Sequence, residues 1–205
     1  MSQELLEIYK KCNNEDIVMK LVMECAPLLS GLRAANIINI TRKEFMALKR
    51  ILRGTEITFY LVAACGDKLS MILYRESVMR SYMLQPKVKK LLKKVGYPDD
   101  DSIYELLYRF SLKYNNFMEG KGEFPHEMGL FLGYPVEDVL GYIDNDGKNF
   151  LAIGYWKVYK NKREKTMLFK KFEEAKEVMI TLISYGLNIK EVINIFSSQR
   201  NALEI

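Results

Sequence analysis

Residues that commonly build disulfide scaffolds and metal centres are scarce in this chain. Three cysteines and one histidine occur among its 205 residues. The cysteines, Cys12, Cys25 and Cys65, are far apart, odd in number and without a CxxC pair, which argues against a disulfide framework or a redox pair. One histidine and three scattered cysteines offer no local ligand pair, so we predict no metal site.

Long apolar runs are also lacking. The longest, Ile57 to Cys65, has about half the length that a membrane-spanning helix needs. The chain begins with MSQELLEIYKK, which lacks the apolar core and the cleavage site of a secretory signal. We therefore expect a soluble, cytoplasmic protein without a membrane partner.

Nucleotide-binding and calcium-binding loops are missing in their complete form. Gly120-Lys121-Gly122 lacks the third glycine of a dinucleotide loop, and no GxxxxGK[ST] motif occurs. Asp144-Asn145-Asp146-Gly147 resembles the middle of a calcium loop, but Tyr142 and Ile153 stand where the first and last ligands should be. The sequence therefore names no cofactor, and we predict a turn here.

The composition that is present suits one folded unit. Hydrophobic residues make up 49% of the chain and charged residues 28%, enough for one substantial core, so we expect a single globular domain over residues 1–205. The net charge is +5, with 26 acidic residues interspersed among the basic ones. This balance permits a nucleic-acid partner but does not indicate one.

The pattern of apolar residues predicts an α+β fold, with a small, largely antiparallel sheet flanked by several helices. β-Branched and aromatic runs predict strands at Ala35–Ile40 and Phe150–Tyr159 and a hairpin over Glu56–Tyr74. We expect this hairpin and Phe150–Tyr159 to share the sheet. Helices are expected at Glu15–Ser30, after the capping box of Thr41 and Glu44, and at Arg75–Leu84, Pro86–Val95, Asp101–Phe117, Lys165–Tyr185 and Ile189–Ser198.

Cys25 is a candidate nucleophile, because a thiol is strongly nucleophilic when its thiolate is stabilised. Pro27 interrupts the first helical pattern, so either a helix ends near Cys25 or a new one begins near Pro27. In the second case the helix dipole would lower the thiol pKa, with His126 as the base and Glu127 or Asp138 as the orienting group. In the alternative, Cys25 is a small buried residue of an apolar helix.

His126 lies in the stretch FPHEMGLFLGYPVEDVLGYI, residues 124–143. Its ring titrates near neutral pH and can serve as a general base, a hydrogen-bond donor or an anion ligand. It can equally be an early helix residue whose ring bonds a backbone carbonyl. Pro125 and Pro135 suit the first positions of two short helices joined at Gly133-Tyr134. These assignments leave His126 as the residue that folding explains least.

Two clusters of basic residues remain. The lysines from Lys87 to Lys94 alternate with apolar residues, as is typical of the solvated face of an amphipathic helix. The second cluster, Lys157 to Lys165, interleaves with Tyr155, Trp156 and Tyr159, which can stack on a nucleic-acid base or a flat ligand. Strand packing followed by a charged turn is the other interpretation of these residues.

Three blocks of the sequence resemble a known family. CAPLLSGLRAANI (25–37), FPHEMGLFLGYPVEDVLGYI (124–143) and GYWKVY (154–159) are similar to the signature blocks of the domain-of-unknown-function family DUF3793. The resemblance covers essentially the whole chain and implies a bacterial protein, mainly of clostridial type. It brings no activity with it. Arg33 stands where the family pattern suggests lysine, and the positive charge is kept.

These observations lead to three functional hypotheses. The first is a protein that binds a small molecule or a partner in a pocket where the three blocks meet. We expect Cys25, His126, Glu127 and Lys157 to line this pocket, with Trp156 as an apolar wall. The ligand-binding candidates are Arg33, Trp156, Lys157 and Tyr159. The second is a thiol-dependent hydrolase or transferase with Cys25 as nucleophile and His126 as base. The third is nucleic-acid binding through the basic and aromatic residues 155–165.

Overall fold

The first described helix continues past its proline. The computed structural model describes residues 17–98 and 102–203, and helix α2 spans Ile17–Leu29 with Pro27 inside its last turns. The expected helix boundary near Cys25 or Pro27 is therefore wrong. Proline removes one helical hydrogen bond, but the buried residues on both sides of it keep the helix packed against the sheet. Residues 15 and 16 of the predicted helix lie outside the described residues.

Three antiparallel strands form the main sheet in the order β1-β3-β2. They are β1 (Ala35–Thr41), β2 (Ile57–Cys65) and β3 (Lys68–Arg75). The hairpin of β2 and β3 was predicted, and it turns through Gly66 at a φ of +57°, a left-handed conformation that suits glycine. Because β3 is central, both neighbours satisfy its backbone hydrogen bonds.

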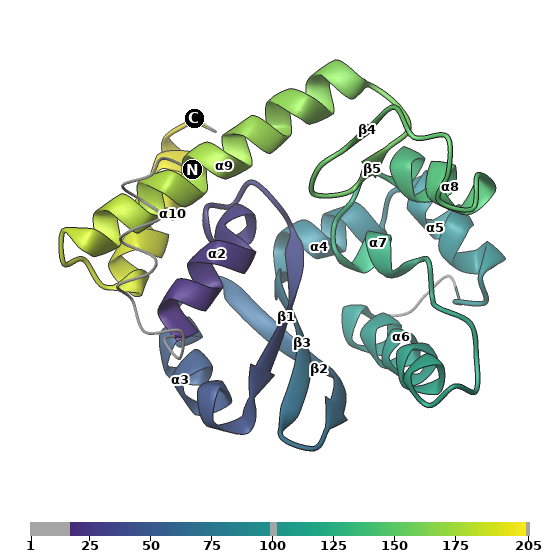
Figure 1. The fold of residues 1–205 in the computed structure, drawn as a ribbon, viewed down its shortest axis with the longest axis horizontal. Helices are drawn as coiled ribbons and strands as arrows, with labels where there is room; N and C mark the ends of the chain where they lie inside the picture. The colour runs from purple at the N-terminus through teal and green to yellow at the C-terminus, as the bar shows by residue number, and fades with distance from the viewer. Residues whose placement is uncertain (1–16, 99–101, 204–205) are drawn as a thin grey trace.

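Each face of this sheet is buried by a different set of helices. On one face, Ile38 and Leu73 join a core with α2, α3 (Arg42–Leu52) and residues of the two C-terminal helices. On the other face, Ile72 and Tyr74 join a second core built by the helices of the middle of the chain. The two sides are visible in Figure 1, where α2 and α3 lie on the opposite side of the strands from α6. Burial on both faces explains why most of the central strand β3 reads as an apolar run.

The helices of the middle of the chain follow the predicted pattern closely. They are α4 (Glu76–Met83), α5 (Pro86–Lys94), α6 (Ile103–Met118), α7 (Met128–Phe131) and α8 (Val136–Asp144). The two short helices α7 and α8 are joined through Gly133, whose φ is +70°, although they begin after Pro125 and Pro135 rather than at them. The predicted capping box of α3 is present, with Glu44 N donating to Thr41 Oγ1 at 3.2 Å.

The segment from Phe150 to Tyr159 departs from the prediction. It forms a separate hairpin of two very short strands, β4 (Ala152–Ile153) and β5 (Lys157–Val158), and not a strand of the main sheet. The turn at Gly154 lies so close to Phe169 that a Cβ would overlap its ring. Tyr155 and Trp156 pack on Phe169 and Phe172 of the following helix and do not join the main sheet.

The chain ends with two helices. Helix α9 (Lys162–Ser184) crosses the molecule in Figure 1, from the β4–β5 hairpin to α2, and α10 (Ile189–Leu203) packs against its second half. The described residues therefore form a mixed α+β fold of nine helices, a three-stranded antiparallel sheet and a small hairpin, as predicted for the fold class. No helix within residues 17–98 and 102–203 is long and apolar enough to span a membrane.

Candidate functional site

His126 is exposed and lies in a ring of aromatic residues. Its ring centroid is 5.4 Å from that of Phe124 and 5.3 Å from that of Tyr142. Pro125 and Glu127 on either side of it are buried. The chain is thus anchored at both neighbours, while His126 itself is exposed.

Glu127 is held by Lys113 of α6 and by Tyr97, which follows α5. It is 4% exposed, and its Oε1 accepts hydrogen bonds from Lys113 Nζ at 2.8 Å and from Tyr97 Oη at 3.2 Å. Burial and the nearby Glu127 carboxylate raise the pKa of Tyr97. These two contacts connect the loop before α7 to α6 and to the segment after α5, so Glu127 has a structural role.

Asp138 connects α8 to the β4–β5 hairpin. It is 2% exposed, and its Oδ2 accepts from Trp156 Nε1 at 2.8 Å. Its Oδ1 accepts from the backbone N–H groups of Tyr159 and Lys160 at 2.7 and 3.1 Å. A buried carboxylate with three donors is well satisfied, so Asp138 fixes Trp156 and the chain after β5.

The hydrogen bond to Asp138 helps to position Trp156 and, with it, the neighbouring Lys157. The Trp156 ring stacks on Tyr134 with centroids 5.0 Å apart and meets Phe169 edge to face. Lys157 Nζ donates to Gly147 O at 2.8 Å and lies 5.5 Å from the centroid of the Tyr142 ring. The indole is buried, whereas the ammonium group is half-buried.

A cavity of about 430 Å³ lies between these groups. We call it the His126 cavity. It is lined by Ile37, Phe124, His126, Met128, Gly129, Leu132, Tyr134, Asp138, Val139, Tyr142, Trp156 and Lys157. Most of these side chains are apolar or aromatic, and His126 and Lys157 are 31 positions apart in the chain. Of the residues named from the sequence, His126, Asp138, Trp156 and Lys157 are brought together here, while Cys25 and Glu127 do not line the cavity.

Cys25 is fully buried, with an exposed fraction of 0%. Its Sγ lies 3.3 Å from Asn36 Nδ2, which donates a hydrogen bond to it. Burial raises the pKa of the Cys25 thiol to about 12, against the smaller lowering effect of Asn36. Because Cys25 lies inside α2 and not before a helix start, the expected help from a helix dipole is wrong.

Arg33 and Tyr159 line two further cavities. Arg33 belongs to a cavity of about 340 Å³ beside α4 and α9, which we call the Arg33 cavity. Trp156 lines both the Arg33 cavity and the His126 cavity, so it forms a shared wall. Tyr159 packs so tightly on Gly141 that a Cβ there would overlap it, and it faces a larger groove.

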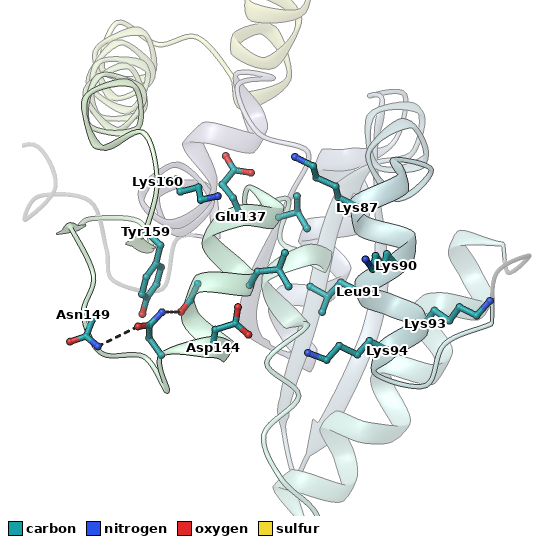
Figure 2. A pocket seen from close by; sticks show the side chains of 14 residues that line it. Lys87, Lys90, Leu91, Lys93, Lys94, Glu137, Asp144, Asn149, Tyr159 and Lys160 are labelled. Atoms are coloured by element: carbon teal, nitrogen blue, oxygen red, sulfur yellow. Dashed lines mark hydrogen bonds between the residues drawn. The ribbon is translucent and has the colours of Figure 1, made fainter.

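This larger groove, of about 930 Å³, lies between α5 and α8. We call it the lysine groove because Lys87, Lys90, Lys93, Lys94 and Lys160 line it. In Figure 2, Lys87 and Lys94 extend over the gap toward α8, which carries Glu137 and Asp144 on the opposite side. Glu137 is paired with Lys165 at 3.2 Å, so positive charge predominates along the α5 side.

Sequence reasoning missed the aromatic lining of the His126 cavity. Phe124, Tyr134 and Tyr142 stand in the same block as His126, and their number in so short a stretch was the available signal. What the sequence could not supply is their convergence, which depends on the turn at Gly133. In the described parts of the chain, no group of three or more His, Cys, Asp or Glu residues could hold a metal ion.

Most of the chain, including the residues that line these cavities, matches the model of a known protein family. The family model described as "Protein of unknown function (DUF3793)" matches residues 21–193, a range that includes all three cavities. No curated protein and no solved structure matches the chain.

Proposed function

We propose that this chain, which belongs to the DUF3793 family of proteins of unknown function, binds a small molecule in the His126 cavity and does so in the cytoplasm. The observation that carries the proposal is the concave, largely aromatic cavity of about 430 Å³ with His126 and Lys157 among its few polar lining residues. Binding sites for small molecules are typically of this size, mostly apolar, with a few polar groups that orient the ligand.

The charges at the cavity favour a neutral or anionic ligand. Lys157 supplies a cation, and His126 can donate a hydrogen bond. The carboxylate of Asp138 is already engaged by three donors, so it adds little demand for a cationic ligand. The aromatic walls of Phe124, Tyr134 and Tyr142 suit a flat apolar body.

A suitable probe is 8-anilinonaphthalene-1-sulfonate, a flat aromatic anion whose fluorescence rises in apolar sites. We expect saturable binding with one probe per chain. Lys157→Gln should weaken it about tenfold, because a hydrogen bond to a charged group is typically worth that factor. His126→Gln should weaken it as well, with less risk to the fold because His126 is exposed.

The matched control is Lys148→Gln. Lys148 lies on the nearby turn, is exposed, pairs with Asp146 and does not line the cavity. Its variant removes the same charge and should bind the probe as the wild type does. If binding does not saturate, or if Lys148→Gln and Lys157→Gln weaken it equally, the proposal is wrong.

The thiol-dependent alternative has weaker support. Cys25 is fully buried and its pKa is raised to about 12, whereas a nucleophilic cysteine needs an exposed thiol with a lowered pKa. His126 is exposed and its ring neighbours are Phe124 and Tyr142. We therefore place binding ahead of a Cys25 and His126 reaction.

Nucleic-acid binding stays a proposal, but the surface that we propose for it is now the lysine groove and no longer the aromatic residues Tyr155 and Trp156. Tyr155 and Trp156 pack in a core with Phe172, and Tyr155 donates to Glu173 at 2.6 Å, so they are poorly placed to stack on bases. The lysine groove is the better binding surface for a nucleic acid. Affinity for single-stranded DNA that falls steeply with salt and with Lys90→Gln would favour it, because phosphate contacts release counterions.

A further inference from the structure

Arg33 is a buried cation with an open hydrogen-bonding position. Its side chain is in the segment between α2 and β1, and the residue is 8% exposed. Its Nε donates to Leu132 O at 2.9 Å, and its guanidinium lies 4.7 Å from the centroid of the Tyr134 ring. Among the described residues, its buried Nη2 has no hydrogen-bond partner. Burial lowers the pKa of Arg33.

Arg75, which is also buried, shows how this protein satisfies the hydrogen-bond donors of a buried guanidinium. Arg75 is 1% exposed. Its Nη1 donates to Glu56 Oε2 at 2.7 Å, and its Nη2 and Nε donate to the carbonyls of Leu29 and Leu28. No described carboxylate forms a comparable ion pair with Arg33. An unpaired buried charge is costly. The lack of a paired carboxylate at Arg33 therefore requires an explanation.

The residues around Arg33 suggest why it has no paired carboxylate. Arg33 lines the Arg33 cavity with the apolar residues Leu32, Val78, Trp156, Leu168 and Phe172, among others. The lining contains no acidic residue, and Ser81 and Gln85 on the α4 side bring neutral polar groups. The cavity thus combines one positive charge, apolar walls and uncharged hydrogen-bonding groups.

We propose that the Arg33 cavity binds a second small molecule that carries a single carboxylate on an apolar body. The planar guanidinium of Arg33 matches the geometry of a carboxylate, and its buried Nη2 has no hydrogen-bond partner among the described residues. One cation balances one negative charge, which favours a monocarboxylate over a doubly charged phosphate. This site is independent of the ligand proposed for the His126 cavity, although Trp156 borders both.

Calorimetric titration with benzoate tests this site, with benzamide as the uncharged probe of the same shape. We expect benzoate to bind the Arg33 cavity of the wild type, and benzamide to bind this cavity at least about tenfold more weakly, because it lacks the charge that Arg33 would pair with. Arg33→Gln should remove this preference. Equal binding of the two probes to the wild type would overturn the proposal.

A second pair of variants keeps the test independent of any loss of folding in Arg33→Gln. Ser81 is exposed on α4 and lines the cavity, whereas Ser77 is exposed one turn earlier and does not. Ser81→Phe should block benzoate and Ser77→Phe should not. Lys157→Gln should leave benzoate binding intact. If Lys157→Gln abolishes benzoate binding while Ser81→Phe leaves it unchanged, the carboxylate binds in the His126 cavity and the inference is wrong.

Discussion

Cys25 illustrates how burial decides the chemistry of one side chain. The thiol is fully buried in α2, and its pKa is raised to about 12. A raised pKa keeps the thiol neutral throughout the physiological range, since the thiolate forms only as pH approaches 12. At pH 8 only about one thiol in ten thousand would be ionised, so Cys25 is a poor nucleophile in the folded protein.

This predicts selective alkylation by iodoacetamide. At pH 8 the exposed Cys65 should react in the folded protein, while Cys25 should react only after urea is added. Mass spectrometry of the tryptic peptides distinguishes the two sites, and Cys65 serves as the internal control. Labelling of Cys25 in the native protein at a rate close to that of Cys65 would restore the thiol-dependent hypothesis.

The sequence could not decide between the two readings of Cys25. A proline two residues later is compatible with a helix start, and that reading would have made the thiol reactive. The outcome was set by long-range packing of α2 between the sheet and α9, which overrides a local signal. For His126 the sequence left open what the ring faces, and the structure places it between Phe124 and Tyr142.

Asp138 connects two elements of the structure, and the local sequence pattern does not reveal this connection. In the first turn of α8 its charge agrees with the helix dipole, which is one structural role. The structure gives it a further one, because it joins α8 to Trp156 and to the backbone after β5. The hairpin therefore depends on a carboxylate that lies 18 residues before the tryptophan.

Asp138→Asn should destabilise the protein by about 3 kcal/mol, because an amide presents a donor to buried donors and removes the charge. Urea unfolding followed by circular dichroism measures this. Asp144→Asn on the same helix is the matched control, since Asp144 is exposed, and it should change stability by less than about 0.5 kcal/mol. Equal effects of the two variants would contradict the role assigned to Asp138.

The main strands and helices were predictable because their signals are local and agree with one another. The hairpin of β2 and β3, the capping box of α3 and the end of α9 before Gly186 all follow from nearby residues. The β4–β5 hairpin was misassigned because Tyr155 and Trp156 have strand-forming character but pack on α9. Its location depends on contacts distant in sequence.

At the scale of the whole protein, the His126 cavity, the Arg33 cavity and the lysine groove are each lined in part by segments that carry the family resemblance. The His126 and Arg33 cavities share Trp156 as a wall, and the lysine groove lies beyond Tyr159. The sequence predicted a pocket where the three blocks meet. Of the named residues, His126, Asp138, Trp156 and Lys157 line the His126 cavity. Arg33 lines the neighbouring cavity, and Cys25 belongs to the core.

Because Trp156 is the single tryptophan of the chain, its indole N–H gives one resonance in a proton–nitrogen correlation spectrum. Titration with 8-anilinonaphthalene-1-sulfonate is the most direct measurement of binding in the His126 cavity. The account predicts a saturable shift of this resonance in the wild type and in Lys148→Gln, with about tenfold weaker affinity in Lys157→Gln. A probe that binds while the indole resonance stays in place would contradict it.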